Sequence, residues 1–204
     1  MQAARLHAFG PSTEIQVTDA PAPGPLAPHD VLVRVVASGV NPIEWKIRSG
    51  AMAMALGRPL PITLGWECAG IVEQVGTEVT GFLPGQAVYA YPEFTRDGTH
   101  AELVVIHHLQ LARKPESLTF EQAAAVPMTA QAAWSLLEAA GDVVGRRVLV
   151  HGGAGSVGHW LVQLARQRGA QVLATCSTAD MQQVLALGAH EVIDYRTRRF
   201  EDFG

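Results

Sequence analysis

The chain has few cysteines, few charged residues and no long apolar run, and each shortage excludes a class of protein. Two cysteines among 204 residues are too few for a disulfide framework or a four-cysteine zinc site. A membrane-spanning helix needs about 20 consecutive apolar residues, and the sequence contains neither such a run nor an apolar leader core. We therefore expect a cytoplasmic protein with no membrane partner. The formal net charge of −4 offers no basic surface, so we expect no nucleic-acid partner either.

The rest of the composition is that of an ordinary globular protein, with 48% hydrophobic residues and length for one or two domains. The sequence changes character near residue 115. Before this point, short β-type runs alternate with turns rich in proline and glycine, which predicts a mostly antiparallel β domain with a few short helices. The clearest predicted strands are residues 31–36, 70–75, 86–91 and 101–105.

After residue 115 the pattern alternates between helix and strand. Helices are predicted at 119–125 and 129–140, and strands at 148–150, 171–176 and 190–195, with a helix between each pair of strands. This order is typical of an α/β fold that begins a doubly wound parallel sheet. We therefore predict two domains, residues 1–115 and 116–204.

The most specific pattern is a glycine-rich turn between a predicted strand and a predicted helix. The run V-L-V-H-G-G-A-G-S-V-G-H-W places Gly153, Gly155 and Gly158 in the spacing G-x-G-x-x-G. In dinucleotide-binding turns the first glycine allows a tight turn, the second lets the backbone approach a pyrophosphate, and the third lets helix and strand pack closely. The N–H groups of the helix N-terminus then face the phosphates. The predicted binding turn consists of Gly153, Ala154, Gly155, Ser156, Val157 and Gly158.

The strand after this turn indicates which dinucleotide to expect. A protein that prefers NAD carries an acid at the end of this strand, about 20 residues beyond the glycines, where it binds the ribose hydroxyls. Cys176 stands at that position, and Ser177 and Thr178 follow it. Two uncharged hydroxyls suit a 2′-phosphate better than a carboxylate would, so the sequence favours NADP(H) as the cofactor. Asp180 is expected in the first turn of the next helix, and Arg196 on a solvated face.

The nucleotide-binding part stops early. A dinucleotide normally lies between two βαβαβ halves, and only the first half is predicted here. We therefore expect the chain to be the N-terminal part of a longer protein, because alone it would lack one wall of its cleft.

Together the motifs resemble the medium-chain dehydrogenase/reductase superfamily, in its zinc-independent, quinone-oxidoreductase-like branch. Besides the glycine turn, the matching runs are V-L-V-R-V-V-A-S-G-V-N-P-I-E-W-K-I-R-S-G, L-G-W-E-C-A-G-I-V-E-Q-V-G, P-G-Q-A-V-Y-A, D-G-T-H-A-E-L-V-V, F-E-Q-A-A-A-V-P and G-A-H-E-V-I-D-Y. The resemblance implies a chaperonin-10-like catalytic β domain followed by a Rossmann NADP-binding domain. It also implies an active site in the cleft between the domains, and a homodimer.

The resemblance breaks at the zinc ligands. Zinc-dependent members carry a cysteine where this chain has Asn41 and a histidine where it has Trp66. A catalytic zinc needs about three protein ligands, and Glu67 alone cannot hold it. His107 and His108 are adjacent at the end of a predicted strand, so we expect them on opposite faces, unable to chelate together. The remaining histidines show no ligand spacing, and we predict no metal site.

The absence of these ligands narrows the expected chemistry. Without zinc no Lewis acid stabilises an alkoxide, so exchange between alcohols and ketones is disfavoured. In a conjugated acceptor, such as a quinone or an α,β-unsaturated carbonyl, the negative charge that arrives with the hydride moves to a distant oxygen. Hydrogen-bond donors or solvent can stabilise the charge there. The cofactor then carries the chemistry, and the protein supplies position and a dry pocket.

Asn41 and Lys46 are the catalytic candidates by resemblance. Asn41 would hydrogen-bond near the nicotinamide or to the acceptor oxygen, and Lys46 would lie near the cofactor. Asn41 also begins N-P-I-E, a helix start with Asn as N-cap, Pro42 at N1 and Glu44 at N3. Capping leaves one end of the amide for a second role, so both interpretations stay open. Lys46 has the alternative of a solvated surface lysine.

Four further apolar residues also have two interpretations. Trp45 and Trp66 are either pocket walls or core residues. Met52 and Met54 either line an adaptable acceptor pocket or belong to a flexible loop.

The resemblance also assigns cofactor contacts in the second domain. In related sequences a threonine of the linker helix contacts the nicotinamide side of the cofactor. Here Ala132 takes its place, and Thr129 stands about one helical turn earlier, on the same helix face. Ser177, Thr178 and Tyr195 match places where the family meets the adenosine phosphate.

Two functions therefore remain. The intact glycine motif favours an NADPH-dependent oxidoreductase that transfers hydride to a quinone or an α,β-unsaturated carbonyl without a metal. Ala132 and the missing half of the nucleotide-binding domain favour the alternative, a catalytically weak nucleotide-binding protein that acts through a partner.

Overall fold

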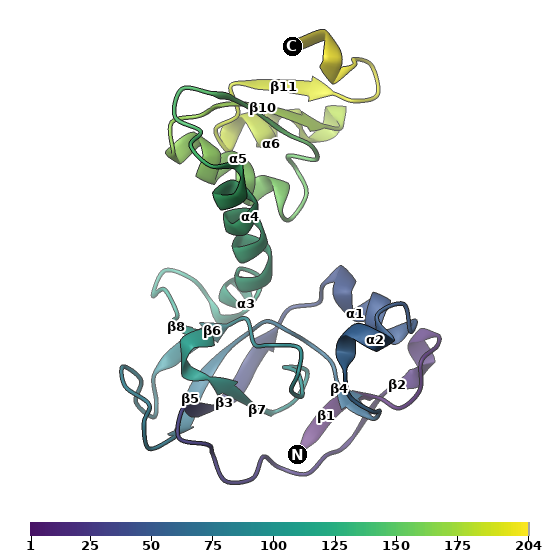
Figure 1. The fold of residues 1–204 in the computed structure, drawn as a ribbon, viewed down its shortest axis with the longest axis vertical. Coiled ribbons are helices and arrows are strands. Elements are labelled where there is room, and N and C mark those ends of the chain that lie inside the picture. Colours follow the sequence, from purple (N-terminus) through teal and green to yellow (C-terminus); the bar gives the residue numbers. More distant parts are fainter. Residues whose placement is uncertain (204) are drawn as a thin grey trace. The chain divides into compact units, whose positions relative to one another are not determined.

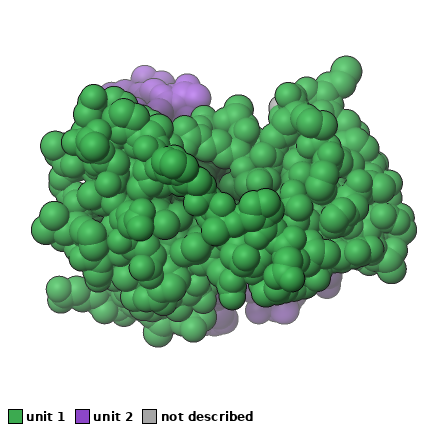
Figure 2. Space-filling view, turned by 90° about the horizontal axis from the view of Figure 1, so that it is seen from below, with its two compact units in different colours: residues 1–128 green, residues 129–204 purple. Residues whose placement is uncertain are grey.

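The computed structural model describes residues 1–203 and divides the chain into two compact units. Unit 1 comprises Met1–Met128 and unit 2 begins at Thr129 (Figure 2). In the described part of the chain, no helix is long and apolar enough to cross a membrane.

Unit 1 contains the antiparallel β domain that the first half of the sequence predicts. Its main sheet has the strand order β7-β3-β5-β6-β8, and every pairing is antiparallel. Alternate residues of these strands, such as Val31 and Val33, point into the core, as the period of two requires. The strands are β3 (Asp30–Ser38), β5 (Cys68–Val75), β6 (Ala87–Ala90), β7 (Leu103–His107) and β8 (Leu111–Arg113).

A second, three-stranded sheet of unit 1 has the order β2-β1-β4. It packs with two short helices around Leu6, Ile62 and the fully buried Trp66. The sequence pattern did not reveal β1 and β2, because their residues do not form an apolar run. The elements are β1 (Gln2–Leu6), η1 (Ser12–Glu14), β2 (Ile15–Asp19), α1 (Pro42–Arg48), α2 (Ala53–Leu56) and β4 (Ile62–Thr63); η2 (His108–Gln110) follows β7.

Unit 1 continues beyond residue 115, where the sequence pattern places the domain boundary. Helix α3 (Phe120–Ala124) packs on the main sheet, where Ala123 and Ala124 lie against Ala69. Small side chains allow this close approach of helix and sheet. The compact unit therefore includes α3 and ends at Met128, inside helix α4 (Pro127–Ala140).

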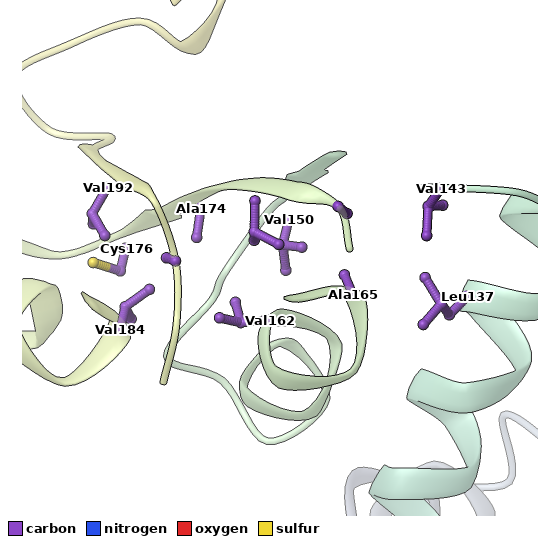
Figure 3. Packing of buried hydrophobic residues seen from close by; sticks show 12 residues of the cluster. Leu137, Val143, Val150, Val162, Ala165, Ala174, Cys176, Val184 and Val192 are labelled. Carbon is purple, nitrogen blue, oxygen red and sulfur yellow. The ribbon is translucent and has the colours of Figure 1, made fainter. Parts of the chain in front are cut away.

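Unit 2 is the start of a doubly wound sheet, as predicted. Its three parallel strands have the order β11-β10-β9, and α5 and α6 cover one face (Figure 1). Val162 of α5 and Val184 of α6 pack toward Val150 and Ala174 of the sheet (Figure 3). The elements are β9 (Arg147–Val150), α5 (Gly158–Gln167), β10 (Gln171–Cys176), η3 (Thr178–Asp180), α6 (Met181–Ala186), β11 (Glu191–Asp194) and η4 (Phe200–Phe203).

The turn between β9 and α5 is packed so tightly that two of its glycines have no room for a side chain. A Cβ on Gly158 would lie 2.1 Å from the carbonyl oxygen of Gly152, and one on Gly153 would lie 2.8 Å from the Cβ of Ala174. Gly155 differs, because its Cβ would meet only the Gly152 oxygen, at 3.2 Å. The positive φ of the turn, 68°, belongs to Gly152. Gly153 therefore serves packing rather than the tight turn that the sequence motif assigns to it.

We expect Gly158→Ala to destabilise the protein by about 1–3 kcal/mol, because the new methyl group would force the turn backbone to move. Gly155→Ala is the matched control and should cost clearly less. Urea unfolding of both variants and the parent protein measures the difference. Equal stability of the two variants would show that the turn is not tightly packed at Gly158.

Candidate functional site

The ends of the three strands of unit 2 form the candidate nucleotide site. The parallel register pairs Val150 with Ala174 and Cys176 with Asp194, so the loops after β9, β10 and β11 leave the sheet at one edge. In open α/β sheets this carboxyl edge is where ligands bind. The glycine turn, Ser177, Thr178 and Tyr195 all lie in these loops, so the structure brings these predicted nucleotide residues to one edge, whereas Thr129 lies on α4.

Thr175 holds the glycine turn in place. Its hydroxyl accepts a hydrogen bond from the Gly152 N–H at 3.0 Å, and its carbonyl oxygen accepts one from the Gly153 N–H at 2.8 Å. Helix α5 then begins at Gly158, so its first N–H groups follow Gly155, the least crowded of the three motif glycines. A Cβ-free backbone beside a helix N-terminus fits a pyrophosphate. The sequence shows no sign of this role, because Thr175 is a β-branched residue inside a predicted strand, where threonine is common.

Cys176 is the last residue of β10, the position that the sequence pattern gives to a ribose-binding acid. It is buried in the core of unit 2, on the same strand face as Ala174 (Figure 3). Burial raises the pKa of its thiol, and the nearby carboxylates of Asp180 and Asp194 add to the effect. Ser177, the first residue after β10, is more exposed than Cys176.

The two hydroxyls after β10 have carboxylate partners. Ser177 Oγ donates to Asp180 Oδ2 at 2.6 Å, and Thr178 Oγ1 donates to Oδ2 of the buried Asp194. The Arg196 N–H donates to the other oxygen of Asp194 at 2.9 Å. The Thr178 hydrogen bond, followed by that from Arg196, holds the pKa of Asp194 below its usual value. The carboxyl edge of the sheet therefore carries negative charge from Asp180 and Asp194 beside the two neutral hydroxyls.

Tyr195 and Arg196 follow β11 beside these hydroxyls. The Tyr195 N–H donates to the Cys176 carbonyl at 3.3 Å, and the Tyr195 side chain is more than half exposed. The Arg196 guanidinium lies 5.9 Å from the centre of the Tyr195 ring. Arg196 is exposed, as the sequence predicts, but it lies next to the loop that the sequence assigns to the adenosine phosphate.

In unit 1, the structure places Asn41 between two buried acids. Asn41 is the N-cap of α1, as predicted, and its backbone N–H donates to Glu44 Oε2 at 2.8 Å. Its side-chain Nδ2 donates to Glu67 Oε1 at 2.5 Å. Both carboxylates are at least 95% buried, with exposures of 5% for Glu44 and 2% for Glu67. Burial raises the pKa of the Glu44 carboxyl.

Glu67 is a functional candidate that sequence reasoning considered only as an insufficient zinc ligand. Its Oε2 accepts a hydrogen bond at 3.0 Å from the backbone N–H of Met128, at the start of α4. Its own carbonyl oxygen accepts from Ser38 Oγ at 2.9 Å and from Thr99 Oγ1 at 3.0 Å. The only sequence signal was an acid followed immediately by the buried strand that begins at Cys68.

Some of the aromatic and methionine candidates lie in the core, and others lie at the surface. Trp66 is fully buried and its ring lies 5.1 Å from that of Phe94, so it is a core residue. Trp45 is about half exposed, and Lys46 is exposed with its Nζ 6.0 Å from the Trp45 ring centre. Met54 is 97% exposed, on the short helix α2 rather than on a loop.

Met52 is partly buried against the cluster around Leu6, and does not stand free in a pocket. Thr129 is buried on the face of α4 that also carries Ala133 and Leu137. Ala132, at the position where the sequence resemblance implies a threonine, is half-buried on the same helix.

The expected separation of His107 and His108 is wrong. Their rings lie 5.0 Å apart, and the His108 ring stacks on that of His29 at 5.6 Å. Strand β7 ends at His107 and a 3-10 turn begins at His108, so the alternation of strand faces no longer applies. Within residues 1–203, no group of three His, Cys, Asp or Glu side chains has a geometry that could hold a metal ion. Burial raises the pKa of the Cys68 thiol to about 12, which keeps it protonated.

The sequence has well-matched relatives. It is 37% identical over 192 residues to human NAD(P)H oxidoreductase RTN4IP1, covering 86% of this chain and 48% of the relative. It is 38% identical over 180 residues to 2-methylene-furan-3-one reductase of Solanum lycopersicum, covering 84% and 46%. It is 37% identical over 205 residues to the quinone oxidoreductase of Mus musculus, covering 99% and 60%. The chain thus spans about half the length of the curated relatives it matches.

The fold also matches a solved structure and a family description. The Escherichia coli quinone oxidoreductase complexed with NADPH superposes with a TM-score of 0.82 at 30% identity, covering 100% of this chain and 61% of that one. Residues 27–116 match the alcohol dehydrogenase GroES-like domain. With the glycine turn in its expected place, these likenesses show that the chain belongs to the medium-chain dehydrogenase/reductase superfamily.

Proposed function

We propose that the chain is part of an oxidoreductase that transfers hydride from NADP(H) to a quinone or an α,β-unsaturated carbonyl without a metal. The glycine turn carries this proposal, because it combines a side-chain-free backbone at Gly155 with a helix N-terminus at the carboxyl edge of a parallel sheet. When bound, the nicotinamide cofactor would supply the hydride chemistry. Similarity to a quinone oxidoreductase and to a furanone reductase supports conjugated carbonyl acceptors.

The donor set in unit 1 supports chemistry without zinc. Asn41 offers an amide, Trp66 is enclosed in the core, and the Glu67 carboxylate already accepts hydrogen bonds at both oxygens. A catalytic zinc requires about three nitrogen, sulfur or carboxylate ligands around one open position, and these side chains cannot provide them. The protein would instead position the reactants and meet the developing negative charge with N–H donors such as the Asn41 amide.

The cofactor choice rests on the loops after β10 and β11. Ser177, Thr178 and Tyr195 would surround the adenosine ribose, and Arg196 would supply the positive charge that a 2′-phosphate needs. Asp180 and Asp194 oppose a phosphate, so Arg196 decides the balance in this proposal. Thr129 would lie near the nicotinamide in place of the threonine lost at Ala132.

We further propose a cytoplasmic homodimer. The alternative function, a catalytically weak nucleotide-binding protein that acts through a partner, is favoured by one observation. Position 132 carries an alanine, which cannot offer the hydroxyl that relatives place there.

Replacing Gly155 tests the nucleotide site. Gly155→Asp should lower NADPH affinity at least about 100-fold, because a carboxylate would crowd and repel the pyrophosphate. Gly155→Asn has the same shape without the charge and should bind more tightly than the Asp variant. Fluorescence titration of the complete gene product with NADPH measures both. Unchanged affinity in Gly155→Asp would place the phosphates elsewhere.

Replacing Arg196 tests the cofactor choice. Arg196→Gln should weaken NADPH binding about tenfold or more, the loss expected for one charge-assisted hydrogen bond, and leave NADH binding nearly unchanged. Arg198→Gln is the control, because Arg198 lies over the Phe203 ring, 4.0 Å from its centre, rather than over Tyr195. Competitive titration with the two cofactors gives the ratio. A parent protein that prefers NADH would instead indicate that Asp180 binds the ribose.

Metal content tests the proposed mechanism. We expect elemental analysis of the purified complete gene product to find no stoichiometric zinc, since Asn41 and Trp66 replace two ligands. One tightly held zinc per chain would contradict a metal-free mechanism.

A further inference from the structure

Asn41 is held at more than one point, and this fixes which way its amide faces. Its backbone at the start of α1 is tied to Glu44, because the Asn41 N–H donates to Glu44 Oε2 at 2.8 Å and the Asn41 carbonyl accepts from the Glu44 N–H at 3.2 Å. Its Nδ2 donates to Glu67 Oε1 at 2.5 Å. An ionised carboxylate can only accept hydrogen bonds, so Glu67 requires the nitrogen, not the oxygen, of the amide on its side. The backbone bonds hold Asn41 in place, and the carboxylate selects the orientation of its amide.

The Glu67 carboxylate itself has little freedom to move. Its other oxygen accepts the Met128 N–H at 3.0 Å, in the first turn of α4, where a helix dipole favours negative charge. Its backbone is held by Ser38 and Thr99, and by the Gly39 N–H at 3.2 Å. A Cβ on Gly39 would lie 2.1 Å from Glu67 Oε1, so the carboxylate occupies space that only glycine leaves open.

An amide nitrogen carries two N–H groups, and the hydrogen bond to Glu67 uses one of them. We propose that Glu67 is a positioning residue that fixes the Asn41 amide, so that its second N–H is presented to a carbonyl oxygen of the bound cofactor or acceptor. This inference rests on the proposed function and adds the residue that sets the donor. Glu67 does not touch either reactant and acts through Asn41.

The orientation can be observed without any ligand, because Asn41 is the only asparagine in the sequence. Selective ¹⁵N-asparagine labelling of the 204-residue chain gives one pair of side-chain N–H signals. The side-chain proton that is hydrogen-bonded to the carboxylate should resonate well downfield of the other proton on the same nitrogen. In Glu67→Gln this difference should shrink, since a neutral amide is a weaker acceptor.

Glu44→Gln is the matched control. Glu44 is also a buried acid bonded to Asn41, but it accepts from the backbone N–H rather than from the side chain. Its replacement should shift the backbone signal of Asn41 and leave the separation of the side-chain pair unchanged. Gly39→Ala is a second perturbation, which displaces the carboxylate without removing its charge and should also reduce the separation. An unchanged side-chain pair in Glu67→Gln would overturn the proposal.

A double-mutant cycle in the complete gene product tests the role in the reaction. Glu67→Gln and Asn41→Ala should each lower kcat/KM for a quinone at least about tenfold, the cost of a misplaced donor. The double variant should be no worse than Asn41→Ala alone, because Glu67 acts only through the amide. A purely structural role for Glu67 would give additive losses and would overturn the proposal.

The NADPH dissociation constant shows whether Asn41 donates to an oxygen of the cofactor or to one of the acceptor. If Asn41 donates to the cofactor, both single variants weaken NADPH binding; if it donates to the acceptor, they lower activity at unchanged NADPH affinity. Either result supports the proposal, and no effect on binding or turnover in either variant overturns it. Failure of the proposed function would appear differently, as a parent protein that reduces neither quinones nor enones, while the amide signals still decide the orientation of Asn41.

Discussion

A carboxylate removed from water must obtain its hydrogen bonds from the protein, and in unit 1 the burial of Glu67 imposes this requirement. The donors come from Asn41 and Met128, which are far apart in the sequence. Meeting the requirement therefore fixes the start of α1, the start of β5 and the start of α4 relative to one another. At position 41, where the resemblance to zinc-dependent proteins implies a cysteine, this chain has an amide whose N–H donates to the Glu67 carboxylate. The departure from the zinc pattern thus leaves no unpaired buried charge at Glu67.

In unit 2 the glycine turn depends on the absence of side chains at two positions. The turn after β9 approaches β10 and the start of α5 so closely that Gly153 and Gly158 have no space for a Cβ. Interiors are packed at crystal-like density, so such a contact cannot relax without moving backbone. Gly155, which is less crowded, lies between these two packed glycines. Packed glycines on both sides hold the backbone N–H groups of the turn in place. A pyrophosphate site benefits from this, because N–H groups that are fixed before binding lose less conformational freedom when the ligand binds.

The parts of the structure that were predictable from sequence are those with a local physical signal. The glycine spacing, the strand at 171–176 and the Asn41 cap depend on residues within one turn or one strand, so their patterns indicated the structure directly. The partners of Glu67 could not be predicted, because nothing local connects it to Met128. The inward face of Cys176 depends on which side of the sheet α5 and α6 cover. Long-range packing, not propensity, decides these features.

The nucleotide edge shows why residue types alone mislead about charge. Ser177 and Thr178 are neutral, yet each hydroxyl has one proton and each proton is donated to a carboxylate. To bind a 2′-phosphate by donation, these hydroxyls would have to leave Asp180 and Asp194 and expose the acids to a second anion. Donors that are not committed in this way, such as the guanidinium of Arg196, can meet a phosphate without that loss. In the proposed NADP(H) site, the charge that follows β11 would therefore matter more for cofactor preference than the hydroxyls that follow β10.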